Sequence, residues 1–148
     1  MSLLPGIIPK PGDVYMCDFS GYVTPEIVKL RRVIIVSPPN PGARIALVVP
    51  VSTTRPRILT AVHVELPGGH VYRCFTGASE VWVKADLIAH VRFDRLDRVR
   101  IPVFDTAGIP VPRRYEYLAT VTLSPAHFRE VRQAMLHALG LGRLAPGV

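Results

Sequence analysis

Two near-continuous apolar runs, Val33–Ser37 and Ile45–Val51, dominate the hydrophobic pattern of the chain. The turn-forming residues between them suit an antiparallel pair of strands. Apolar and polar residues alternate in Ala61–Leu66 and Glu80–Lys84, which predicts strands with one buried face. Further strands are expected at Val14–Phe19, Leu87–Phe93, Ile101–Phe104 and Tyr115–Thr122, the last two forming a hairpin around Asp105–Gly108.

One segment near the C-terminus has the helical period. Ser124 is a good N-cap, Pro125 suits the first helical position, and apolar residues then recur at helical spacing as far as Leu139. Gly140 is a fitting residue just past the helix end, and a frayed tail is expected over 141–148. Many short strands followed by one helix predict a mainly β domain, a small curved barrel capped by a helix.

Composition supports one folded domain over residues 1–148. Hydrophobic residues make up 49% of the chain, and mean hydropathy is +0.28, which excludes a disordered class. No apolar run reaches the ~18–20 residues that a membrane-spanning helix needs. The two cysteines, Cys17 and Cys74, lack metal-site spacing, so we expect reduced thiols, no metal and no cofactor in a cytoplasmic protein.

The charge of the chain narrows the class of partner. The net charge is +7 and the isoelectric point is near 10.0, with arginine supplying most of the positive charge. Such a balance favours polyanions, with nucleic acid first and an acidic protein second. Charge alone does not identify the partner, because many basic domains bind only counterions.

Candidate chemistry stands at one end of each apolar run. Arg31 and Arg32 directly precede the first run, and Ser52 and Thr53 directly follow the second. If the two strands are neighbours, guanidinium groups lie near a row of hydroxyls and backbone amides, which suits a phosphodiester. In RNA cleavage, where the 2′-hydroxyl attacks the adjacent phosphate, Arg31 would stabilise the developing charge and Ser52 would hold phosphate oxygens.

Plainer interpretations of the same residues stay open. The arginines would merely flank a strand, and the Ser52–Thr54 hydroxyls would mark an ordinary strand end. The histidines, His63, His70 and His90 among them, suit acid–base chemistry near neutral pH, but a residue without a catalytic role is the more common case. The alternating charges of Arg92–Arg98 are typical of a self-paired surface.

The order of several short segments resembles the MazF/PemK family, the toxins of type II toxin–antitoxin pairs. The matching segments are Pro11-Gly12-Asp13-Val14, Asp18-Phe19, Pro25-Glu26-Ile27-Val28-Lys29-Leu30-Arg31, Val33–Pro38, Val48–Thr53, Trp82–Ile88 and Arg95-Leu96, together with the C-terminal helix. The P-E-x-V-K-x-R segment is similar to a longer PemK-like branch. No single motif is decisive, but the order and spacing cover most of the chain.

The resemblance implies an SH3-like barrel that acts as a homodimer and cleaves single-stranded RNA without metal, leaving a 2′,3′-cyclic phosphate. The family's catalytic arginine falls on Arg31, its catalytic threonine on Ser52 with Thr53 adjacent, and the acidic residue of its long loop on Glu26. Glu26 would orient Arg31 or handle a proton, and an ion pair of purely structural role is the equal alternative. Residues expected to contact RNA are Lys29, Arg32, Thr54, Arg55 and Arg57. Two departures stand out: Arg32 replaces the usual proline, and Ser52 replaces the commoner threonine.

Partners follow from the resemblance and from the sign of the charge. An acidic antitoxin would fold across the basic cleft and compete with RNA. DNA would be contacted only indirectly, through the antitoxin complex, and no membrane partner is expected. Two rival functions remain: a gyrase-binding toxin of the CcdB type, which needs no hydrolytic site, and an RNA-binding barrel without catalytic activity.

Overall fold

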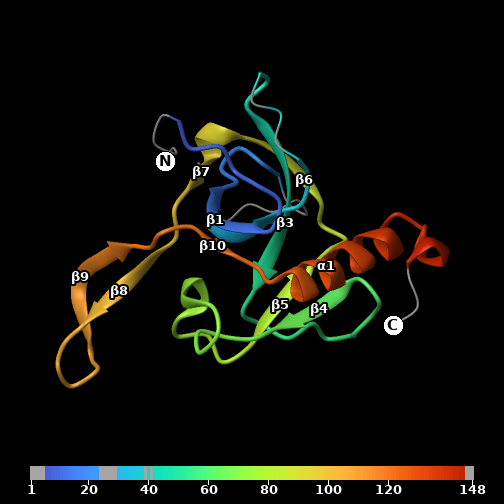
Figure 1. The fold of residues 1–148 in the computed structure, drawn as a ribbon. Helices are drawn as coiled ribbons and strands as arrows, with labels where there is room; N and C mark the ends of the chain where they lie inside the picture. The colour runs from blue at the N-terminus through green and yellow to red at the C-terminus, as the bar shows by residue number, and fades with distance from the viewer. Residues whose placement is uncertain (1–5, 24–29, 39, 41, 146–148) are drawn as a thin grey trace.

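The fold is an antiparallel β structure with one C-terminal helix (Figure 1). A computed structural model describes residues 6–23, 30–38, 40 and 42–145. Within them, the main sheet contains β1 (Asp13–Asp18), β2 (Leu30–Ile35), β3 (Ile45–Ser52), β4 (His63–Leu66), β5 (Val81–Lys84), β6 (Ala89–Arg92), β7 (Leu96–Asp97) and β10 (Val121–Thr122). A separate hairpin contains β8 (Arg100–Phe104) and β9 (Pro110–Tyr117).

Two strands of the main sheet each change partner along one edge. The first half of β3 pairs with β6, whereas its last residues, Val51 and Ser52, pair with β5. Strand β1 likewise pairs first with β10 and then with β7. A strand that serves two neighbours in succession makes the sheet curl. The long apolar strand β3 therefore belongs both to the part of the sheet that contains β6 and to the part that contains β5.

The predicted barrel is only partly realised. The class, mainly β with a C-terminal helix, is confirmed, but the hydrogen-bonded ladder among the described strands is open, with β10 and β4 at its ends. The strands β6 and β7 lie at opposite ends of the path β6-β3-β2-β1-β7. They are joined by the short 3-10 turn Phe93–Arg95 (η2) rather than by a ladder. The sheet therefore curls round on itself, and a covalent link takes the place of the last hydrogen-bonded pairing.

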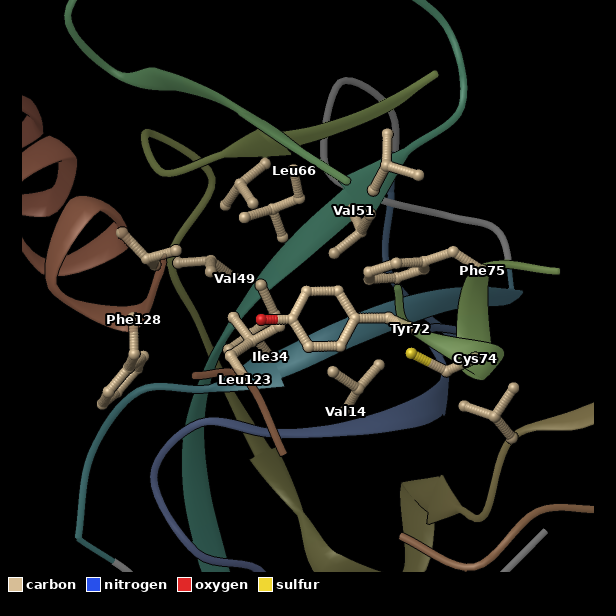
Figure 2. Packing of buried hydrophobic residues seen from close by; sticks show 14 of the residues in the cluster. Val14, Ile34, Val49, Val51, Leu66, Tyr72, Cys74, Phe75, Leu123 and Phe128 are labelled. Atoms are coloured by element: carbon tan, nitrogen blue, oxygen red, sulfur yellow. The ribbon is translucent and has the colours of Figure 1, made fainter. Parts of the chain in front are cut away.

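The curled sheet is buried on both faces, which explains the unbroken apolar runs. On one face Tyr15, Val33, Val48 and Phe93 belong to a core inside the curl. On the other face lies a larger core, part of which Figure 2 shows around Tyr72. Because successive side chains of a strand point to opposite faces, the consecutive apolar residues Val33, Ile34 and Ile35 of β2 serve the two cores in turn.

The α-helix packs beside β4 and β5 and is held at its first turn (Figure 1). It runs from Pro125 to Ala138, and the Ser124 hydroxyl accepts a hydrogen bond from the His127 N–H at 3.3 Å, as the N-cap prediction requires. The hydroxyl of the buried Tyr72 accepts from the Ser124 N–H at 2.9 Å and bonds to Nδ1 of His127 at 2.5 Å. Tyr72 thereby ties the helix start to the short 3-10 turn Arg73–Phe75 (η1).

The helix ends as the sequence predicts. Gly140 adopts a φ of +74°, a left-handed conformation that glycine accepts without strain. Within the stretch where a frayed tail is expected, Gly142–Leu144 form a further 3-10 turn (η3). No helix among the described residues is long and apolar enough to cross a membrane.

The β8–β9 hairpin projects from one side of the molecule, at the lower left of Figure 1. Its turn is the expected one, because Oδ1 of Asp105 accepts from the N–H groups of Ala107 and Ile109, both at 2.9 Å. The expected second strand, Tyr115–Thr122, is divided in the structure. The hairpin strand ends at Tyr117, and Val121–Thr122 pair instead with β1.

Candidate functional site

Arg31 and Ser52 lie just beyond the paired residues of β2 and β3. The register pairs Ile35 with Val48 and ends with Val33 opposite Pro50. Arg31 and Ser52 each lie two residues beyond that pair, and Ser52 pairs with Trp82 of β5. Residues two apart share a face of a strand, so Arg31 follows the face of Val33 and Ser52 follows that of Pro50. The sheet thus brings the two strand segments together, and the contact of both side chains with one phosphate stays a prediction.

The two side chains differ in how they are held. Arg31 is half-buried and forms no hydrogen bond or ion pair within the described part of the chain. Ser52 is buried, and its hydroxyl accepts from the Thr54 N–H at 3.1 Å and donates to the Thr54 carbonyl at 3.4 Å. Ser52 thus fixes the turn at the end of β3, where Thr53 and Thr54 are exposed. The accessible hydroxyls of this turn belong to the two threonines.

An arginine and the single tryptophan continue the site beyond Ser52. Trp82 pairs directly with Ser52 across β3 and β5, and the Cζ atom of Arg55 lies 5.5 Å from the centre of its ring. The ring is buried, and Nε1 of Trp82 has no hydrogen-bond partner in the described structure. Arg57 is exposed, two residues further along the same segment. Arg55 and Arg57 are therefore both exposed just after the end of β3, and their contact with RNA stays a prediction.

Arg32 lies on the opposite face of β2 from Arg31. It pairs with Met16 of β1, whereas Arg31 pairs with the buried Cys17. Its guanidinium is half-buried, and Nε is enclosed without a hydrogen-bond partner among the described groups. Burial lowers the pKa of Arg32, and the nearby Cys74 thiol counteracts part of that shift. Arg31 and Arg32 thus face different surroundings although they are adjacent in the chain.

Two of the predicted site residues, Glu26 and Lys29, lie outside the described residues. Their predicted roles therefore remain predictions. Within the described ranges, no three side chains of the His, Cys, Asp and Glu types gather in a way that could hold a metal ion.

His63 has a side-chain partner, His90 is contacted through its backbone carbonyl, and the charged stretch around β7 contains an ion pair. Nδ1 of His63 accepts from the Thr60 N–H at 3.1 Å, and the His90 carbonyl accepts from the Tyr22 hydroxyl at 3.0 Å. Arg92 and Asp94 form an exposed ion pair at 3.1 Å, as the alternating charges predicted.

Arg95 has a more specific role than the sequence suggested. Its Nη1 donates to the carbonyls of Asp18 at 2.9 Å and Ser20 at 2.7 Å, and its guanidinium lies over the Tyr22 ring. Arg95 therefore fixes the start of the segment that leaves β1. Sequence reasoning missed these contacts because Arg95 is 77 residues from Asp18 and 75 residues from Ser20 along the chain.

Sequence reasoning also missed two stacked arginine–tyrosine pairs at the β8–β9 hairpin. Arg98 lies over Tyr117 and Arg100 over Tyr115, at 5.2 and 5.0 Å from the ring centres. The alternation of arginines before β8 and of tyrosines in β9 was a usable signal, since residues two apart in a strand share a face. Finding it required knowing which strands of the hairpin pair.

The fold and the site define a small antiparallel β protein whose arginines gather beside a strand-end turn rich in hydroxyls. The family model described as PemK-like, MazF-like toxin of type II toxin–antitoxin system matches residues 10–139. The chain belongs to this family. It is also 30% identical over 111 residues to the uncharacterised protein YifN of Escherichia coli (strain K12), a match that covers 62% of this chain and 74% of the relative.

Solved structures with the same fold come from toxin–antitoxin systems. A MazF crystal structure from Deinococcus radiodurans (Form-I) is 23% identical, with a TM-score of 0.58, and covers 90% of this chain and 98% of that one. An endoribonuclease in complex with its cognate antitoxin, from a mycobacterial species, is 24% identical, with a TM-score of 0.54 and coverage of 90% and 96%. At these identities the likeness establishes the fold alone.

Proposed function

We propose that this protein is a toxin endoribonuclease that cleaves single-stranded RNA at a short sequence. The observation that carries the proposal is the β2–β3 register, in which Arg31 and Ser52 each lie two residues beyond the last pair, Val33 and Pro50. Family membership supports it, as do the endoribonuclease activities named for proteins of similar fold. In the proposed reaction the ribose 2′-oxygen attacks the adjacent phosphorus, and the bond to the 5′-oxygen breaks. The products are a 2′,3′-cyclic phosphate and a 5′-hydroxyl.

Each named residue has a chemical task in this reaction. Arg31 stabilises the negative charge that grows on the non-bridging oxygens, a task for which the planar guanidinium fork is well shaped. The Ser52 turn presents backbone N–H groups and the Thr53 hydroxyl to the phosphate. The 2′-hydroxyl loses a proton and the leaving 5′-oxygen gains one, and Glu26 is the proposed group for one of these transfers. Lys29, Arg32, Thr54, Arg55 and Arg57 would hold flanking phosphates.

The proposal extends to assembly and control. The toxin acts as a homodimer in the cytoplasm, and an acidic antitoxin neutralises it by covering the basic site. Antitoxin complexes named for proteins of similar fold support this part. The net charge of +7 favours an acidic partner over a basic one.

Cleavage of a mixed RNA pool in the presence of EDTA tests the proposal. We expect the wild-type protein to release fragments that end in a cyclic phosphate, and Arg31→Ala to lower the rate by about 100-fold or more. Arg31→Lys should restore only part of the rate, because an ammonium group keeps the charge but loses the bidentate geometry. Arg129→Ala, which removes an exposed arginine from the helix, is the matched control and should cleave normally.

The same assay separates the rival functions. Full activity in Arg31→Ala would refute the assigned site, and activity that disappears in EDTA would refute a metal-independent reaction. RNA that is shifted in a gel but never cut would indicate a binding barrel. Neither binding nor cleavage, together with inhibition of gyrase, would indicate a CcdB-type toxin.

A further inference from the structure

A second candidate surface lies where the β8–β9 hairpin meets β1 and β2. A pocket of about 460 Å³ is open there, and its lining includes Arg32, Arg98, Arg100, Tyr115 and Tyr117. We call this pocket the hairpin groove. The hairpin lies on the side of the molecule away from the α-helix in Figure 1.

Guanidinium groups and aromatic rings alternate along the hairpin side of the groove. Arg98 and Arg100 each stack on a tyrosine, Tyr117 and Tyr115 respectively. Both tyrosines remain more than half exposed, at 52% and 56%. An exposed ring with a guanidinium against it offers a flat surface on which a nucleobase can stack, next to a donor for phosphate.

The contacts made by the opposite face of the hairpin determine which way its arginines and tyrosines point. Ile101 pairs with Glu116, and Ile101 is buried in the larger core. Glu116 forms an ion pair with Arg73 of η1 at 3.0 Å, and the Leu118 N–H donates to the Val99 carbonyl at 2.8 Å. Because side chains alternate between faces, burial of Ile101 leaves the arginines and tyrosines on the groove side.

One residue that lines the groove, Arg32, carries an unsatisfied donor. Nε of Arg32 is buried and has no hydrogen-bond partner among the described groups. A buried donor without an acceptor is costly, whereas an acceptor supplied by a ligand removes that cost. An anionic oxygen bound beside Arg32 would be such an acceptor.

We propose that the hairpin groove binds one nucleotide of the single-stranded RNA substrate, with its base on Tyr115 or Tyr117 and its phosphate at Arg32 and Arg100. The inference rests on the proposed ribonuclease function and extends its substrate contacts beyond the reacting phosphate. Arg32 directly follows Arg31, with Cα atoms about 3.8 Å apart, so an RNA strand that fills both sites crosses the start of β2.

The acidic residues of the groove favour RNA over an acidic peptide. Asp18 and Asp97 also line it, and each carboxylate already accepts one backbone N–H, at 2.8 Å from Ser20 and Arg98 respectively. Two carboxylates would repel an acidic peptide along its length. A nucleotide carries one charge and presents base edges, whose amino groups donate to carboxylates.

Binding of a fluorescent 2′-O-methyl oligonucleotide, which the protein cannot cleave, tests the proposal directly. We expect Tyr115→Ala and Tyr117→Ala each to weaken binding by about tenfold, the effect of losing one stacked base. Tyr115→Phe should bind like the wild type, because phenylalanine keeps the ring. The control is Arg132→Ala, which removes a guanidinium stacked on a ring (Phe128, 4.3 Å) in the helix, and it should leave the affinity unchanged.

A photo-crosslink separates this inference from the proposed function. An oligonucleotide that carries 5-iodouridine should crosslink to the β9 peptide that contains Tyr115 and Tyr117, whether or not the protein cleaves RNA. If the protein cuts RNA but crosslinks only elsewhere, and the tyrosine variants bind normally, the groove assignment is wrong while the ribonuclease assignment stands. The groove assignment is equally wrong if the tyrosine variants only lose self-association or antitoxin binding.

Discussion

Arg31 and Arg32 are adjacent in sequence and have different surroundings. Arg31 has no side-chain partner within the described residues, whereas Arg32 lines the hairpin groove and has a buried Nε. Arg32 therefore adds a cation to a second surface, on the opposite face of β2 from Arg31.

The Ser52 hydroxyl has a structural partner, and this leads to a prediction at the residue scale. Ser52→Ala leaves the Thr54 N–H without its acceptor, so we expect the free energy of unfolding to fall by about 1 kcal/mol. Thr53→Ala, at an exposed position, should change it by less than about 0.5 kcal/mol. Chemical denaturation measures both values. Equal stability of the two variants would show that the turn does not depend on the Ser52 hydroxyl.

The two cysteines are buried thiols with raised pKa values. Burial raises the pKa of Cys17 and of Cys74 from 9.0 to about 12. Because the thiolate is the reactive form, we expect a thiol reagent such as DTNB to label the folded protein very slowly. The unfolded chain should react at both of its cysteines, which gives the full signal for comparison. Rapid labelling of the folded protein would contradict the burial of these thiols.

The same shifts predict how stability depends on pH. In the unfolded chain a thiol ionises near its ordinary pKa of 9.0, whereas Cys17 in the folded protein keeps its proton up to about 12. The contribution of Cys17 is complete below about pH 9 and is lost progressively as the pH rises toward 12. When the pH rises from about 8 to about 10, the free energy of unfolding of Cys17→Ala should fall by about 1 kcal/mol less than that of the wild type. Denaturant curves at the two pH values measure this difference, and identical losses would refute it.

At the scale of elements, one buried carboxylate joins three segments at the edge of the sheet. Asp13 of β1 accepts from the Lys10 N–H at 2.9 Å, the Thr122 hydroxyl of β10 at 2.7 Å and the Tyr15 hydroxyl at 3.3 Å. Strand β10 has only two residues, so side-chain contacts of this kind hold the edge together. They also set the path of the chain from the hairpin into the helix.

The carboxylate of Asp13 should therefore be important for stability. We expect Asp13→Ala to lower the free energy of unfolding by about 2–3 kcal/mol, because three donors lose a charged acceptor. Thr122→Val, which removes only one of the donors, should cost about 1 kcal/mol and serves as the comparison. Urea denaturation followed by circular dichroism measures both. A smaller loss in Asp13→Ala than in Thr122→Val would refute the assigned role.

At the scale of the whole molecule, we expect the affinity for RNA to depend on where the positive charges lie rather than on their total. Each phosphate contact with a single strand contributes about −0.7 to the slope of log affinity against log salt. Removing Arg55 and Arg57 together should therefore flatten the slope by about 1.4. The matched control is the double variant Arg129→Ala/Arg143→Ala, which removes the same charge from the exposed surface of α1 and η3.

Salt titrations of binding to an uncleavable oligonucleotide measure these slopes. We expect the control variant to keep the wild-type slope, because only phosphate contacts release counterions on binding. Equal flattening in the two double variants would mean that net charge, rather than the Arg55–Arg57 segment, sets the affinity for RNA.

The sequence by itself determined most of the strands and the helix, and it predicted the candidate site residues. The apolar runs around Val33 and Val48 had to be strands, and Ser124 and Gly140 delimited the helix, because these patterns act within a few neighbouring residues. The placement of Arg31 and Ser52 at the strand ends was likewise readable.

Only the tertiary structure decided how distant segments meet. It divided the expected strand Tyr115–Thr122, left the sheet open, joined Tyr72 to His127, and turned the tyrosines of β9 toward Arg32. These outcomes depend on contacts between residues far apart in the chain, which leave no local pattern of polar and apolar positions. The physical reason is burial: Ile101 and Leu118 must reach the core, and this requirement alone orients the hairpin and its groove.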